Sequence, residues 1–166
     1  QLGLERTAIS ALDAKAADPS SPELRLRRAA VDSLKRSIEH ASDLDISLLC
    51  GPLFQGLGKF TGKSVQSDEW KYAVDTIREV GEFAKAFPIK LALEPLNRFE
   101  MYLVTTVADG VRFVEDVGLP NVGLLVDTHH GNIEENNTAM AWEKAADHIF
   151  HVHISENNRG VPGSGQ

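Results

Sequence analysis

The sequence predicts an α/β fold in which short parallel strands alternate with single helices. Three short apolar runs, at 46–50, 89–94 and 122–127, read as strands buried on both faces of a sheet, and a fourth follows at 149–154. Stretches with helical spacing of apolar residues separate them, so the last three strands start one βα unit apart. We therefore expect a parallel sheet with covering helices.

The first helix is predicted to begin at residues 21–23. Ser21 can cap free backbone amides, Pro22 is tolerated in a first turn, and the charge of Glu23 complements the helix dipole. Apolar residues then recur at helical spacing as far as Ala41. The strand at 46–50 follows, and it stops at Gly51 and Pro52.

A glycine-rich loop leads from this strand to a second helix, which opens near residues 67–69. The strand at 89–94 comes next. A third helix should start near Val107 and end at Gly118. The strand at 122–127 should be followed by a polar loop, a short helix around Trp142 and the last strand.

Two architectures share this alternation, an open doubly wound sheet and a (β/α)8 barrel. No G-x-G-x-x-G fingerprint follows a strand, which weakens the dinucleotide-binding alternative. Acidic residues and His at the ends of several strands favour the barrel, whose catalytic groups come from different strand ends. A barrel needs about 250 residues. We therefore predict that 1–166 is a single domain and a partial barrel, truncated at both ends.

Composition indicates a globular protein of the cytoplasm. The formal net charge of −7 is a poor match for phosphate backbones, so nucleic acid is not an expected partner. No apolar stretch approaches the roughly 20 residues of a membrane span, so we expect no membrane association. Cys50 is the one cysteine, which excludes a disulfide within the chain and suits a reducing compartment.

Three of the predicted strands end in a side chain that can bind a metal: Glu94, Asp127 and His153. Each alone has an ordinary explanation, such as an ion pair of Glu94 with Arg98, a turn cap at Asp127 or a core histidine. Their repetition at neighbouring strand ends predicts one metal site. Two carboxylates and an imidazole suit Mn²⁺, Mg²⁺ or Co²⁺ better than a structural zinc.

Polar residues continue beyond each of these strand ends, as the binding of a polyol would require. The segment 159–165 is rich in glycine but lacks the lysine of a phosphate-binding loop. We interpret it as a loop that covers the substrate.

Three segments together resemble one family. They are E-P-L-N-R-F-E at 94–100, D-T-H-H-G-N at 127–132 and H-V-H-I-S-E-N-N-R-G at 151–160. They closely resemble the ketose 3-epimerases, that is, the D-tagatose and D-psicose (D-allulose) 3-epimerases of the xylose-isomerase-like barrel superfamily. The resemblance extends over most of the chain from about Ser21 and implies a barrel from the end of strand 2 through strand 6.

The resemblance also implies roles for single residues. Glu94, Asp127 and His153 match metal ligands, and Glu94 also matches a proton-transfer carboxylate. Positions that match substrate-binding residues are Glu100, His130 and Arg159. The implied reaction is the epimerisation of a ketose at C3 through an enediolate, with Mn²⁺ as the expected metal.

Two departures from the family pattern stand out. His129 and Gly131 occupy positions that are usually aromatic and Met, so the pocket wall is expected to differ. The family's fourth metal ligand, which is also its second proton-transfer residue, is a Glu on the eighth strand and has no match in the chain. The chain by itself is therefore expected to be a poor catalyst.

Other functions remain open at this stage. An aldose–ketose or hydroxypyruvate-type isomerase would use the same fold, whereas an endonuclease of the superfamily would need more histidines and a basic groove. A partial barrel also leaves open sheet edges and exposed core. We therefore expect a homo-oligomer, and the alternative from another class is a non-catalytic fragment that self-associates.

Overall fold

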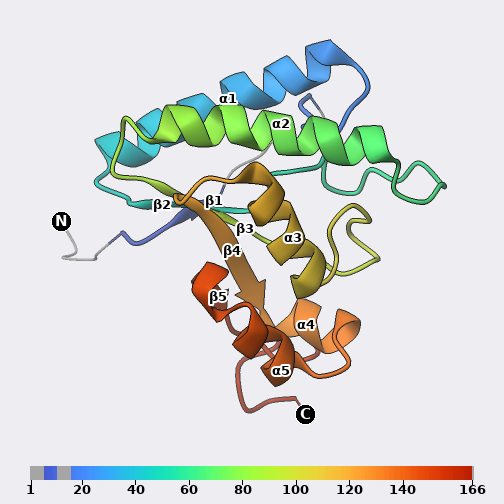
Figure 1. The fold of residues 1–166 in the computed structure, drawn as a ribbon. Coiled ribbons are helices and arrows are strands. Elements are labelled where there is room, and N and C mark those ends of the chain that lie inside the picture. Colours follow the sequence, from blue (N-terminus) through green and yellow to red (C-terminus); the bar gives the residue numbers. More distant parts are fainter. Residues whose placement is uncertain (1–5, 11–15, 166) are drawn as a thin grey trace.

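The computed structural model describes residues 6–10 and 16–165. Five parallel strands form one sheet in which the order in space follows the order in the chain (Figure 1). The strands are β1 (Ile9–Ser10), β2 (Leu48–Gly51), β3 (Lys90–Leu93), β4 (Val122–Asp127) and β5 (Ile149–His153). The expectation about truncated ends concerns Gln1 and Gln166, which lie outside the described residues.

Helices connect the strands, and the three longest, α1, α2 and α3, cover one face of the sheet (Figure 1). The helices are α1 (Leu24–Asp43), α2 (Ser67–Ala84), α3 (Val107–Val117), α4 (Thr128–Glu134) and α5 (Thr138–Lys144), with a 3₁₀ turn at Ala146–His148. A parallel sheet in sequential order, with its long helices on one side, is part of a (β/α)8 barrel. The predicted fold is confirmed.

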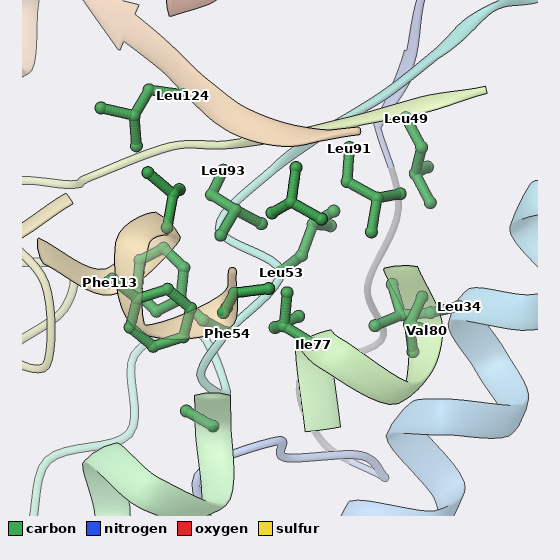
Figure 2. Close-up of a cluster of buried hydrophobic side chains, with 14 of the residues drawn as sticks. Leu34, Leu49, Leu53, Phe54, Ile77, Val80, Leu91, Leu93, Phe113 and Leu124 are labelled. Carbon is green, nitrogen blue, oxygen red and sulfur yellow. The ribbon is translucent and has the colours of Figure 1, made fainter. Parts of the chain in front are cut away.

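The alternation of side chains along the strands separates two apolar clusters. On β3, Leu91 and Leu93 pack against the helices in the larger cluster, part of which Figure 2 shows. Ala92 lies on the opposite, inner face of the sheet with Cys50 and Leu125. Because side chains two residues apart share a face, the inner face continues beyond Ala92 and Leu125 to acidic residues at the carboxyl ends of the strands.

One helix start and one loop differ from the predictions. Helix α1 begins at Leu24, after the predicted start, and the Ser21 hydroxyl accepts a hydrogen bond from the amide of Glu23 at 3.1 Å in the turn before it. The predicted polar loop after β4 is wrong, because the chain continues into α4. Asp127 is the reason, since its carboxylate caps the free amides of His129 and His130.

A register shift between β4 and β5 sets the position of the last strand. It falls between Leu124 and Leu125, after which Asp127 pairs with His153. Gly123 allows the two strands to approach this closely, because a Cβ at this position would meet the His148 carbonyl oxygen at 2.6 Å and the Phe150 ring at 2.7 Å.

In the described part of the chain, no helix is long and apolar enough to cross a membrane.

Candidate active site

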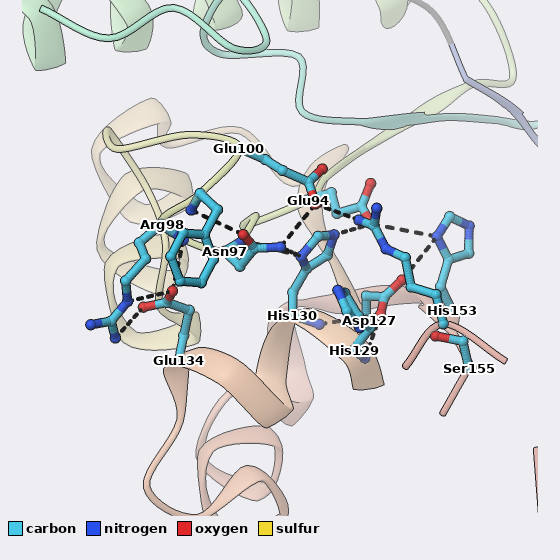
Figure 3. A network of polar contacts seen from close by, with 12 residues as sticks. Glu94, Asn97, Arg98, Glu100, Asp127, His129, His130, Glu134, His153 and Ser155 are labelled. Atoms are coloured by element: carbon cyan, nitrogen blue, oxygen red, sulfur yellow. Dashed lines mark hydrogen bonds and ion pairs between the residues drawn. The ribbon is translucent and has the colours of Figure 1, made fainter. Parts of the chain in front are cut away.

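The ends of β3, β4 and β5 bring together three side chains predicted as metal ligands (Figure 3). The Nδ1 atom of His153 lies 3.5 Å from Oε1 of Glu94 and 3.7 Å from Oδ2 of Asp127. The pairing of Asp127 with His153 across adjacent strands accounts for this proximity. Glu94 follows β3 directly, so the three groups share one edge of the sheet.

Glu94 is buried with only 8% of its surface exposed. Burial raises the pKa of Glu94 to about 7, the charge of His153 opposes this rise, and the neighbouring Asp127 carboxylate adds to it. The structure therefore places two carboxylates side by side in a poorly hydrated position. A bound cation would relieve their repulsion.

His130, on α4, lies at the same site. Its Nε2 atom is 3.9 Å from Oε1 of Glu94, and its side chain is almost fully buried. One potential ligand atom from each of Glu94, Asp127 and His130 lies within 4.8 Å of the others. By this criterion the described residues group His130, and not the predicted ligand His153, with the two carboxylates, although Nδ1 of His153 lies only 3.5 and 3.7 Å from one oxygen of each.

The donor set fits a hard or borderline divalent ion. Oxygen atoms from two carboxylates and a ring nitrogen converge from three different elements, and the site is partly closed to solvent. Nothing in this set resembles the cysteine-rich sphere of a structural zinc, and Cys50 is a free, buried thiol. The residues present therefore fit the kind of metal that the sequence predicts.

Glu100 and Arg159, two of the predicted substrate-binding residues, form an ion pair beside this group. Nη2 of Arg159 donates to Oε1 of Glu100 at 2.6 Å, which links the segment after β3 to the segment after β5. The side-chain amide of Asn97 donates to the same oxygen at 2.9 Å. The structure thus brings all six predicted site residues to the carboxyl edge of the sheet.

The segment after β5 is held against the start of α4. The Thr128 hydroxyl donates to the carbonyl of Ser155 at 2.6 Å and accepts from the Ser155 amide at 2.8 Å. Nδ1 of His129 lies 3.0 Å from the carbonyl oxygen of Asn157. The sequence did not predict these contacts, because they join segments whose polar residues look like ordinary loop residues.

Arg98 does not pair with Glu94, as the ordinary explanation for that carboxylate would require. Its guanidinium binds Glu134 on α4 instead, with Nη2 2.9 Å from Oε2. His151 lies on the same side of β5 as His153, with the ring centroids 5.2 Å apart. Burial lowers the pKa of His151, and the charge of His153 lowers it further.

Comparison with known proteins identifies the family to which this fold belongs. The whole chain, residues 1–166, matches the family described as Xylose isomerase-like TIM barrel. The chain belongs to this family. The resemblance inferred from the three sequence segments is thereby confirmed at the level of the family.

The named relatives are sugar epimerases, which are isomerases. A "Probable ketose 3-epimerase" of Synechocystis sp. is 36% identical over 137 residues, which are 82% of this chain and 48% of that protein. The D-psicose 3-epimerase of Ruminiclostridium cellulolyticum is 36% identical over 148 residues, covering 89% of this chain and 50% of that protein. The structure of an L-ribulose 3-epimerase matches with a TM-score of 0.91 at 38% identity, over 96% of this chain and 53% of that one. The chain spans about half the length of the curated relatives it matches.

Proposed function

We propose that this chain supplies the metal-holding part of the active site of a ketose 3-epimerase. The observation that carries the proposal is the convergence of Glu94, Asp127 and His153, whose polar atoms lie 3.5 and 3.7 Å apart at the ends of three adjacent strands. The relatives named as ketose 3-epimerases support the reaction, and the acidic net charge of −7 agrees with an uncharged sugar as substrate.

Glu94, Asp127 and His153 would hold the metal, with Mn²⁺ as our first candidate and Mg²⁺ or Co²⁺ as alternatives. When bound, such an ion acts as a Lewis acid on the ketose oxygens, which acidifies the C3 proton and stabilises an enediolate. The capping role of Asp127 leaves Oδ2 facing the site, because Oδ1 accepts from the amide of His129 at 2.6 Å.

Glu94 would remove the proton from C3. It is buried at the strand end, and its oxygen lies within reach of the groups that line the site. Inversion at C3 needs a proton delivered to the opposite face, and the resemblance assigns that second carboxylate to none of the 166 residues. We therefore propose that the chain by itself epimerises poorly.

Glu100, His130 and Arg159 would bind the sugar. The Arg159–Glu100 ion pair joins the segments after β3 and β5, and the buried His130 lies 3.9 Å from Glu94. Groups that donate and accept hydrogen bonds are thus presented together, as several adjacent hydroxyls require.

The test is the exchange of the C3 proton with solvent in the full-length protein. D-psicose in D₂O with Mn²⁺ should gain deuterium at C3, and Glu94→Gln should abolish this gain because an amide cannot accept the proton. Glu143→Gln, on the exposed face of α5, is the matched control and should exchange like the wild type. Retained exchange in Glu94→Gln would refute its role as base. Analysis of the sugars formed separates C3 epimerisation from transfer between C1 and C2.

We further propose a cytoplasmic homo-oligomer. Cys50 is buried and unpaired, which suits a reducing compartment. Among the described residues, Val152 on β5 is 39% exposed and Ile154 just beyond it is 67% exposed, an apolar surface that another copy or another part of the full-length protein would cover. Mass measurement in solution at several concentrations tests this, and a monomer at all of them would refute it.

A further inference from the structure

Asn97 is a buried side chain in the segment after β3, only 2% exposed. Its backbone N–H donates to Nδ1 of His130 at 3.1 Å. Its side-chain Nδ2 lies 2.9 Å from the same ring nitrogen and donates to Oε1 of Glu100 at 2.9 Å. Oδ1 accepts from the amide of Phe99 at 3.0 Å, which fixes the orientation of the side-chain amide. Every polar atom of this side chain therefore has a partner.

These contacts decide where His130 carries its proton. A backbone N–H can only donate, so Nδ1 of His130 accepts, and the proton of the neutral ring lies on Nε2. The lone pair of Nδ1 then accepts from the Asn97 donors. Nε2 carries the proton, so it has no lone pair left for a metal ion. Neither nitrogen of His130 can bind a metal, although its distance from Glu94 and Asp127 would allow it. Its Nε2–H instead faces the site, 3.9 Å from Oε1 of Glu94.

We propose that Asn97 is a positioning residue that holds His130 in the Nε2–H tautomer, so that His130 donates a hydrogen bond to the sugar and stays outside the metal sphere. The part concerning the sugar rests on the proposed function. The same side-chain amide holds Glu100, whose oxygen also accepts from Arg159. Asn97 thereby sets the distance between the His130 donor and the Glu100–Arg159 pair.

The direct test is ¹⁵N NMR of histidine side chains in the full-length, metal-free protein. The signal of His130 is assigned by its loss in His130→Gln, and we expect an unprotonated Nδ1 and a protonated Nε2. In Asn97→Asp, a carboxylate replaces the donor beside Nδ1. A charge-assisted hydrogen bond to this carboxylate should outweigh the remaining backbone contact, so we expect Nδ1 to become protonated. Asn136→Asp adds the same charge at an exposed position between α4 and α5 and should leave the His130 signal unchanged.

Asn97→Ala separates the backbone contact from the side-chain contact. The backbone N–H remains, so the Nε2–H tautomer should persist and Mn²⁺ affinity should equal that of the wild type. Loss of the donor to Glu100 should raise KM for D-psicose more than it lowers kcat. In Asn97→Asp, we expect kcat to fall about 10- to 100-fold, because the Nε2–H donor to the sugar is lost.

A wild-type His130 protonated on Nδ1 would overturn the inference, and so would an Asn97→Asp protein that matches Asn136→Asp in both the NMR signal and kcat. If no ketose is epimerised, the NMR results still decide whether Asn97 sets the tautomer. Failure of the proposed function is thus distinguishable from failure of this inference.

Discussion

Cys50 lies on the inner face of β2 and is 3% exposed. Burial raises the pKa of its thiol to about 11, and the charge of Glu94 adds to the rise. Since the thiolate is the reactive form, only about 0.1% of the thiol is ionised at pH 8. We predict that iodoacetamide labels the folded protein far more slowly than the protein in guanidinium chloride. Equal labelling rates in the two conditions would contradict the burial of Cys50.

His129 occupies a position where the resemblance leads us to expect an aromatic residue, and it holds the segment after β5 through the carbonyl of Asn157. His129→Phe should remove that hydrogen bond, at a cost of about 0.5–1.5 kcal/mol. Faster hydrogen exchange at the amides of Ser155 and Arg159 is the expected result. His40→Phe, exposed on α1, serves as the control. Unchanged exchange at both amides would show that the contact does not hold the segment.

The proximity of Glu94, Asp127 and His153 could be predicted because each ends an apolar run that reads as a strand. Parallel strands place such ends at one edge of the sheet. The role of Asn97 could not be predicted in this way. It depends on a backbone N–H that meets the ring of His130 from another element, and a backbone contact leaves no trace in residue type.

Among the elements, β4 and β5 depend on the absence of a side chain at Gly123. A Cβ there would meet the carbonyl oxygen of His148 at 2.6 Å, and a backbone atom cannot turn away as a side chain can. We predict that Gly123→Ala destabilises the protein by about 1–3 kcal/mol through overpacking. The measurement is the urea midpoint at constant m-value.

Gly62→Ala is the comparison for this change. A Cβ at Gly62 would have no heavy atom within 4 Å, so only the φ of +71° opposes the substitution. Its cost should be about 1–2 kcal/mol, the penalty of a left-handed backbone. If the amides of β4 and β5 exchange hydrogen faster in Gly123→Ala than in Gly62→Ala, the close contact of the added Cβ is the cause. An unchanged midpoint would refute the prediction.

Helix α4 shows why one element escaped prediction. Its seven residues, Thr128–Glu134, are mostly polar, and their pattern lacks the apolar stripe that reveals a surface helix. The helix forms because Asp127 caps it and because Gly131 lies close to Thr138 on α5, where a Cβ would be 3.0 Å from Cγ2. Asp127 therefore serves as both a helix cap and a candidate ligand, two roles that the sequence presented as alternatives.

At the scale of the whole molecule, Asp18 joins two distant segments at the carboxyl edge of the sheet. Its buried carboxylate accepts from the amides of Ser20 and Gly56 and pairs with the ammonium of Lys59. Burial raises the pKa of Asp18, but the hydrogen bonds from Lys59 and Ser20 outweigh it, so the pKa lies below 3.8. The stability that this depression contributes is present above pH 3.8 and is lost as the pH falls through the lowered value.

Asp18→Asn should therefore cost about 1.5–3 kcal/mol at pH 7, the range for hydrogen bonds to a charged group. The urea midpoints of the variant and the wild type should converge as the pH falls from 3.8 through the lowered pKa of Asp18. Asp32→Asn, exposed on α1, should follow the wild type at every pH. A deficit in Asp18→Asn that persists at acid pH would show that packing rather than charge is responsible.

The order of the sheet was predictable because each βα unit is local and a parallel connection allows few arrangements. Strand β1 marks the limit of this reasoning. Among the described residues of this end of the chain, Ile9 and Ser10 pair with β2, and two residues carry no readable period. The sequence located that end of the barrel only through its resemblance to a family.

A metal at the candidate site would tie three strands together, so the whole molecule should respond to it. In the full-length protein, Mn²⁺ at about one hundred times its Kd should add about 2.7 kcal/mol to the free energy of unfolding. Asp127→Asn keeps an oxygen that can cap His129 but removes the charge, so the fold should remain while most of the Mn²⁺ effect disappears. Thermal unfolding with Mn²⁺ and with EDTA measures both effects. An equal rise in Tm for the variant and the wild type would place the bound metal elsewhere, because Oδ2 of Asp127 lies only 3.7 Å from Nδ1 of His153.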